Sequence, residues 1–293
     1  MVWILDMLSS PLMQRALIVA VLVGLSTPVV GTYLVQRGMA LMGDGIGHIA
    51  LTGVALGWLI GAGVGLESPD ALAIPGATIA SLAGAILIEI LRSRGHTSSD
   101  VALAMLFYGG IAGGVILIRF AGGTTTNLTS YLFGSIATVS ESDVHYTAAL
   151  AALILLVGIG LRGPLFMLSY DPEFARASGM RMAMLNICVA MLAALTVSVS
   201  MRVVGVLLVS AIMIVPVAIG QLLAHSFRGT MAIAMVIGVL VCVSGLIITY
   251  LYPFSPGAMI VIIAVGLYLL VAIFTPLTRS IHAAIRPKDR AEK

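Results

Sequence analysis

The chain has 293 residues, of which 60% are hydrophobic and only 9% charged, and its formal net charge is +3. A soluble domain carries about 25% charged residues, so a water-soluble fold is excluded. The mean hydropathy of +1.14 instead predicts an all-α polytopic membrane protein, because helices satisfy their own backbone hydrogen bonds in lipid. Cys188 and Cys242 lie in separate apolar runs, which excludes a zinc ribbon and a disulfide framework.

Nine apolar runs, each near the ~20 residues that cross a membrane, are predicted to form transmembrane helices. Eight remain if one of the shorter runs does not cross. The boundary between the predicted helices 183–201 and 203–225 is placed at Arg202 and Gly205. The predicted helices span residues 14–36, 42–64, 71–91, 101–120, 143–161, 183–201, 203–225, 229–251 and 257–278.

The basic residues predict the orientation of these helices. Twelve of the fifteen Lys and Arg residues fall on one side, and the positive-inside rule makes that side cytoplasmic. The N-terminus is then outside and the C-terminus inside. The whole chain, 1–293, is expected to be one transmembrane domain, with an inner loop at about 162–182 and a short basic cytoplasmic tail at about 279–293.

The segment MGDGIGHIAL places a carboxylate, Asp44, and an imidazole, His48, inside an apolar run. Residues four apart share one helix face, so both side chains can point at a common ion. Insertion of a charged Asp at mid-membrane costs about 2.5–3.5 kcal/mol, and ionisable groups at that depth are functional by default. The competing interpretation is structural: an Asp–His hydrogen bond, or a capping role for Asp44 after Gly43.

Two ligands are too few to hold a divalent cation tightly. Either other helices contribute donors, or a two-fold axis brings a second copy with its own Asp44 and His48. Four nitrogen and oxygen ligands suit tetrahedral Zn²⁺, whereas Mn²⁺ prefers more oxygen ligands and six-fold geometry. The residues therefore favour zinc first and manganese second.

Two further features inside the helices are ambiguous. Glu89 lies one turn before Arg92, and a snorkelling interfacial pair is favoured over a role in an ion pathway. Pro216 interrupts the predicted helix 203–225 and leaves the carbonyl of Ile212 without its usual partner. It is a candidate hinge, although such prolines are often structural.

No phosphate-binding G-x-x-x-x-G-K-[ST] sequence occurs in the chain. If transport is driven by ATP, another polypeptide must supply the ATPase, and this chain is not itself an enzyme. The inner loop contains SYDPEFARASGM, in which Asp-Pro predicts a helix start and Gly179 a stop. A short surface helix there could receive force from such a partner, or be a plain connector.

Five segments together resemble a known family: MALMGDGIGHIALTGVALG, YLFGSIATVSESDV, YDPEFARASGM, VVGVLLVSAIMIVPVAIG and FSPGAMIVIIAVGLYLL. In this order, over about residues 10–280, they resemble the permease subunits of bacterial zinc/manganese ABC importers. Family members usually carry Ala or Ser where Gly45 and Gly47 stand here. Because each glycine weakens a helix by about 1 kcal/mol, a looser backbone is expected around His48.

The resemblance implies a multi-pass protein of the bacterial inner membrane with the ABC importer permease fold. It implies a homodimer surrounded by lipid, a cytoplasmic ATPase dimer that binds ATP, a metal-binding lipoprotein outside and no nucleic-acid partner. Asp44 and His48 of both copies would line the path of transported Zn²⁺ or Mn²⁺, with no permanently bound cofactor. The residues implied to couple to the ATPase are Asp171, Pro172, Glu173, Phe174, Ala175, Arg176, Ala177, Ser178 and Gly179.

Other classes of function are weaker on the sequence. A self-contained proton-coupled metal carrier or channel would use Asp44 and His48 as an exchange pair. The shortage of other intramembrane carboxylates, apart from Glu89, is evidence against it. An intramembrane metalloenzyme would need a fuller ligand set such as H-E-x-x-H, which the sequence lacks.

Overall fold

The structure, a computed structural model, describes residues 7, 9–66, 69–93, 99–122, 125–136 and 139–285. Over these ranges it is built from α-helices, with the short 3-10 helix η1 between α3 and α4. The helices are α2 (Pro11–Gln36), α3 (Met42–Val64), η1 (Pro69–Leu72), α4 (Ala73–Ser93), α5 (Ser99–Phe120), α6 (Thr125–Phe133), α7 (Glu141–Gly160), α8 (Arg162–Tyr170), α9 (Pro172–Ala177), α10 (Met182–Ser200), α11 (Val209–Leu223), α12 (Phe227–Leu251) and α13 (Pro256–Ile285).

Eight of the helices in the described ranges are long and apolar enough to cross a membrane: α2, α3, α4, α5, α7, α10, α12 and α13. Each coincides with a predicted run, which confirms the fold class. The ninth run is the exception. Its helix, α11, has 15 residues and begins at Val209, so the prediction of a helix from residue 203 is wrong.

Residues 201–208 form turns instead of helix, and three of their backbone groups bind partners far away in the chain. The N–H groups of Val206 and Leu207 donate to the carbonyls of Tyr131 and Leu132 at 2.9 and 3.2 Å, and that of Ser135 donates to Arg202 at 3.1 Å. Non-helical backbone at membrane depth is tolerated only where protein buries and satisfies it. These bonds join the turns to the end of α6, a helix that the sequence did not predict.

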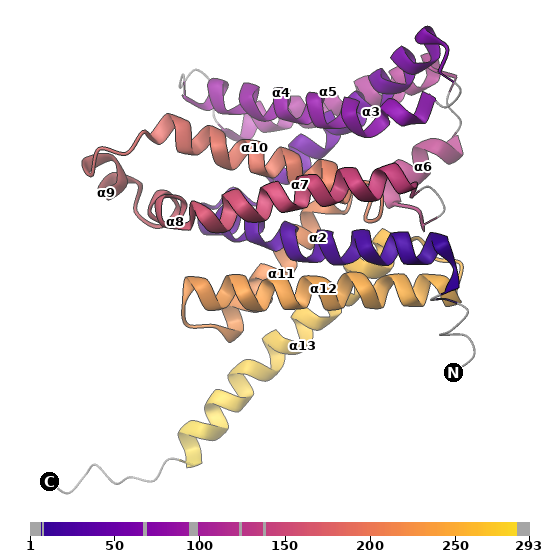
Figure 1. The fold of residues 1–293 in the computed structure, drawn as a ribbon. Helices are drawn as coiled ribbons and strands as arrows, with labels where there is room; N and C mark the ends of the chain where they lie inside the picture. The colour runs from indigo at the N-terminus through magenta and orange to yellow at the C-terminus, as the bar shows by residue number, and fades with distance from the viewer. Residues whose placement is uncertain are drawn as a thin grey trace, which may run out of the picture.

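The long helices run side by side in Figure 1, with α3, α4 and α5 grouped at the top and α13 oblique at the bottom. α3 packs mainly against α4 and α5, and α2 packs against α12. Glycine allows close contact between α3 and α4: a Cβ on Gly53 of α3 would collide with the carbonyl oxygen of Gly76 on α4. Small residues of this kind are the usual basis of tight helix packing in membranes.

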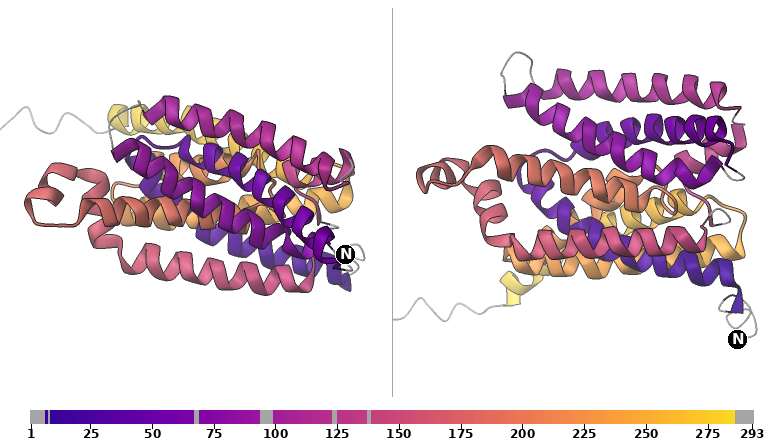
Figure 2. Two further views of the ribbon diagram at one scale, coloured as in Figure 1. Left: turned by 90° about the horizontal axis from the view of Figure 1, so that it is seen from above. Right: turned by 45° about the horizontal axis from the view of Figure 1, so that its top comes forward.

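The start of α2 and the end of α13 lie at opposite ends of the bundle (Figure 1). Both views of Figure 2 show the loop that carries α8 and α9 projecting beyond the long helices, at the end where α13 finishes. The predicted inner loop at 162–182 therefore lies at the same end as the last described residues. Residues 286–293 of the predicted tail are outside the described residues, and the cytoplasmic assignment of this end stays a prediction.

At the other end of the bundle, Arg202 and Asp143 form a buried ion pair. Arg202 Nε lies 3.4 Å from Asp143 Oδ2, and the two side chains are 5% and 10% exposed. Asp143 also accepts the N–H of Ser140 at 3.0 Å and so completes the capping box of α7. The Arg202 guanidinium carbon lies 5.3 Å from the centre of the Tyr131 ring. The pair thus connects α7 to the turns that precede α11.

Candidate metal transit site

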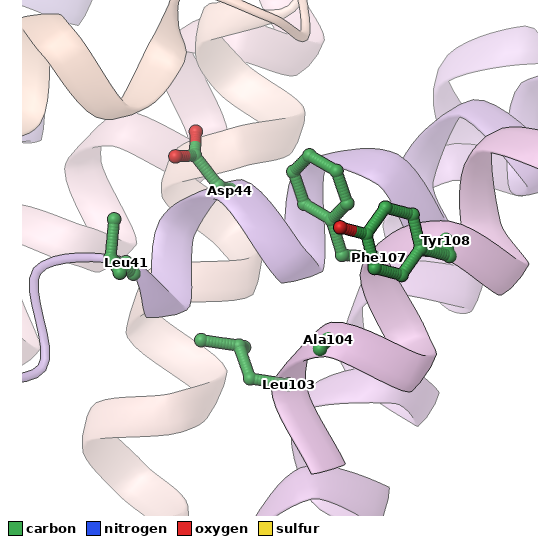
Figure 3. Close-up of a pocket in the computed structure, with 6 residues that line it drawn as sticks. All are labelled: Leu41, Asp44, Leu103, Ala104, Phe107 and Tyr108. Atoms are coloured by element: carbon green, nitrogen blue, oxygen red, sulfur yellow. The ribbon is translucent and has the colours of Figure 1, made fainter. Parts of the chain in front are cut away.

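Asp44 lies in the first turn of α3, where a carboxylate is favoured by the helix dipole. The helix continues without a break through Gly45 and Gly47, and the expected loosening of the backbone stays a prediction. Asp44 is half-buried. Figure 3 shows its carboxylate projecting from α3, with residues of α5 across a cavity. The cavity has a volume of about 250 Å³ and is lined by Leu41, Asp44, Leu103, Ala104, Phe107 and Tyr108.

His48 follows one turn later and is buried, with 2% of its surface exposed. Its Nδ1 lies 2.7 Å from the backbone carbonyl oxygen of Asp44, and its ring centre lies 4.0 Å from that of Phe107. A carbonyl can only accept, so Nδ1 carries a hydrogen, and in the neutral imidazole the lone pair is then on Nε2. Nε2 is buried and has no hydrogen-bond partner in the described part of the chain. This is the arrangement typical of a metal-binding histidine held by a hydrogen bond at its other nitrogen.

These contacts are evidence against the structural interpretation, in which Asp44 caps α3 or its carboxylate holds the His48 imidazole. The N-cap of α3 is Leu41, not Asp44. The hydrogen bond from His48 goes to the backbone of Asp44, so the carboxylate is not used to hold the imidazole. Among the described residues, no group of three or more His, Cys, Asp or Glu side chains could hold a metal ion. Within these residues, a single chain therefore offers Asp44 and His48 without further charged or imidazole ligands.

A cluster of charged groups lies near the start of α3 and connects three helices. Glu89 is buried and pairs with Arg92 at 3.2 Å, as predicted, while Arg92 also donates to the sulfur of Met39 at 3.1 Å. Arg37 donates to Asn186 Oδ1 on α10 at 2.7 Å. Burial and then the charge of Arg92 lower the pKa of the Arg37 guanidinium, while Glu89 raises it. The sequence did not single out Asn186, because no spacing relates it to Arg37.

The inner loop contains the short helix that its sequence predicted, α9. Asp171 Oδ1 accepts the N–H of Phe174 at 2.9 Å and caps the start. Gly179 ends it with a φ of +77°, and the N–H of Met180 donates to the Ala175 carbonyl at 3.2 Å, as in a Schellman motif. Ala175 is buried, whereas the other residues from Asp171 to Gly179 are exposed. α8, which precedes α9, was not predicted.

Pro216, the candidate hinge, is buried in α11, and the helix continues on both sides of it. Its role as a hinge stays a prediction.

The chain is similar to known proteins over nearly its whole length. The ABC 3 transport family matches residues 9–275. The manganese import system permease protein ScaB of Streptococcus parasanguinis is 33% identical over 281 residues, covering 96% of this chain and 93% of ScaB. The manganese transport system membrane protein MntC of Halalkalibacterium halodurans is 32% identical over 271 residues, covering 92% and 90%. A solved structure, PsaBC from Streptococcus pneumoniae in complex with Fab, matches with a TM-score of 0.80 and 32% identity, covering 91% of this chain and 93% of that chain.

Proposed function

This chain belongs to the ABC 3 transport family and is a multi-pass protein of the bacterial inner membrane, and we propose that it is the permease subunit of an ATP-driven importer of divalent metal. The observation that carries the proposal is the unpartnered, buried Nε2 of His48, one turn from the half-buried carboxylate of Asp44. A nitrogen lone pair without a hydrogen-bond partner can coordinate a cation.

Two subunits are needed to complete the site. Each chain supplies one carboxylate and one imidazole, so a homodimer with both turns at its two-fold axis supplies four donors. A site made from two halves can also release its ion, because a relative movement of the subunits separates the donors. We therefore assign Asp44 and His48 of both copies to the translocation path. The self-contained carrier or channel gains no support from the fold or the relatives.

The driving force enters at the loop from Asp171 to Gly179. Phe174 on α9 is 56% exposed, and burial of its aromatic ring against a partner would be favourable. A cytoplasmic ATPase dimer is the partner that fits the family. The loop leads directly into α10, and Asn186 near its start is bonded to Arg37, just before α3. Force on α9 can thus reach the turn that carries Asp44. An extracytoplasmic metal-binding lipoprotein would deliver the ion at the opposite end.

The cargo is manganese or zinc. The manganese names of ScaB and MntC favour manganese as the first ion to test, although four donors alone would also suit zinc.

The test is uptake of radioactive manganese and zinc by cells that lack their own transporter and express the complete importer. Asp44→Ala and His48→Ala should each abolish uptake of the transported ion. Glu141→Ala is the matched control, because this carboxylate is 73% exposed at the start of α7, and the variant should leave uptake unchanged. Undiminished uptake in well-expressed Asp44→Ala and His48→Ala variants would remove these residues from the path.

A further inference from the structure

Ser210, the second residue of α11, is a buried hydroxyl without a partner. It is 5% exposed, and its Oγ has no hydrogen-bond partner in the described part of the chain, a property shared with His48 Nε2. Other buried hydroxyls donate to the carbonyl four residues earlier, as Thr196 donates to Leu192 at 2.8 Å and Ser200 to Thr196 at 2.8 Å. An unpaired buried hydroxyl is unfavourable unless water or a ligand satisfies it.

The local fold explains why Ser210 differs from these hydroxyls. The residue four positions earlier, Val206, precedes the start of α11 and lies in the turns that bind the end of α6. Its carbonyl oxygen faces α3 and would lie 3.2 Å from a Cβ on Gly47. The usual acceptor of a helical serine is therefore directed at the neighbouring helix, and the hydroxyl remains available.

The Ser210 hydroxyl lies directly beside the turn that carries Asp44. Its Oγ would lie 3.0 Å from a Cβ on Gly43, and consecutive Cα atoms are about 3.8 Å apart. Successive residues of a helix point about 100° apart. Gly43 faces Ser210 of α11 and Gly45 faces Leu103 of α5, so Asp44 points between these two helices. Phe107 of α5 lines the cavity that Asp44 borders, and Ser210 lies on the other flank of the same turn, beside Gly43.

We propose that the Ser210 hydroxyl oxygen is a third donor in the transit site and biases it toward manganese over zinc. This inference rests on the proposed function, because it takes Asp44 and His48 as the other donors. Three donors from each of two subunits make six, of which four are oxygens. Six-fold coordination rich in oxygen suits Mn²⁺, whereas Zn²⁺ is satisfied by four ligands. The neutral hydroxyl adds a ligand without adding negative charge, which leaves the ion able to depart.

The experiment uses the complete importer in lipid vesicles and measures KM and kcat for manganese and for zinc. Ser210→Ala should raise the KM for manganese about tenfold and change that for zinc by less than about twofold, because only the six-fold site loses a needed ligand. Ser210→Cys, of nearly the same size, supplies a softer sulfur donor and should invert the preference, with zinc taken up better than manganese. Ser26→Ala is the control, because its buried hydroxyl is bonded to the Leu22 carbonyl at 2.7 Å, and it should leave the ratio of the two KM values unchanged.

The outcomes separate the two proposals. If Asp44→Ala abolishes uptake but Ser210→Ala and Ser210→Cys both keep the wild-type ratio of manganese to zinc, the third donor is overturned and the proposed function stands. An equal loss for both ions in Ser210→Ala, with no inversion in Ser210→Cys, shows a packing role and also overturns it. If Asp44→Ala has no effect, the proposed transit site itself is wrong.

Discussion

Arg37 Nη2 lies 2.7 Å from Asn186 Oδ1, so the residue that follows α2 is bonded to the first turns of α10. This bond connects the helix that follows α9 directly to the segment before α3. Because α9 is the proposed point of contact with the ATPase, the pair is well placed to transmit movement to Asp44.

Asn186→Ala should weaken transport without preventing assembly. A hydrogen bond to a charged group contributes about 1.5–3 kcal/mol, and partial exposure of the pair reduces this, so we expect uptake to fall about fivefold. The measurement is metal uptake per ATP hydrolysed in vesicles. Gln221→Ala, which truncates an exposed amide on α11, is the control. A normal ratio of uptake to hydrolysis in Asn186→Ala would show that force reaches α3 by another route.

Gly53→Ala should destabilise the packing of α3 on α4. The added Cβ would collide with the Gly76 carbonyl oxygen, and overpacking costs about 1–3 kcal/mol. The free energy of unfolding in detergent, or the midpoint of thermal unfolding, should fall accordingly. Gly63→Ala on the same helix is the matched control, because a Cβ there has no neighbour within 4 Å, and it should be neutral or stabilising. Equal behaviour of the two variants would contradict the close contact.

Loss of one member of the Arg202–Asp143 pair should be more harmful than loss of both. Removing one partner leaves a buried charge uncompensated, which costs about 3–5 kcal/mol. Asp143→Asn keeps a polar group at the capping position of α7, so its effect reports mainly the charge. Thermal unfolding of Asp143→Asn, Arg202→Met and the double variant forms a double-mutant cycle. Additive losses in this cycle would show that the two residues do not interact.

Phe174→Ala should weaken the attachment of the ATPase and leave the fold intact. The Asp171 cap of α9 accepts the backbone N–H of residue 174, which the substitution retains. Exposed aromatic anchors often contribute about 2 kcal/mol to an interface, so the Kd for the purified ATPase should rise roughly thirtyfold. Phe254→Ala is the control: this ring is equally exposed, 56%, but follows α12 at the opposite end of the bundle. Unaltered binding in Phe174→Ala would move the contact away from α9.

Much of the fold could be predicted from the sequence, because lipid imposes one requirement on every residue that crosses it. Backbone groups must be satisfied within their own helix. Uncharged runs such as 229–251 therefore predict the bounds of their helices to within a few residues. The same regularity places Asp44 and His48 on one face, and the Asp171–Pro172 cap and Gly179 stop define α9 locally. Each of these features depends only on residues close together in the chain.

The tertiary structure alone decided the features that depend on distant partners. Residues 201–208 are apolar enough for a helix, yet the N–H groups of Val206 and Leu207 donate to the carbonyls of Tyr131 and Leu132. That pairing makes α11 start late, turns the Val206 carbonyl toward α3 and leaves the Ser210 hydroxyl unpaired. Likewise, only packing brings Asn186 to Arg37 and buries Nε2 of His48 beside Phe107. Contacts between segments far apart leave no periodic signal in the sequence, because each partner obeys the pattern of its own segment.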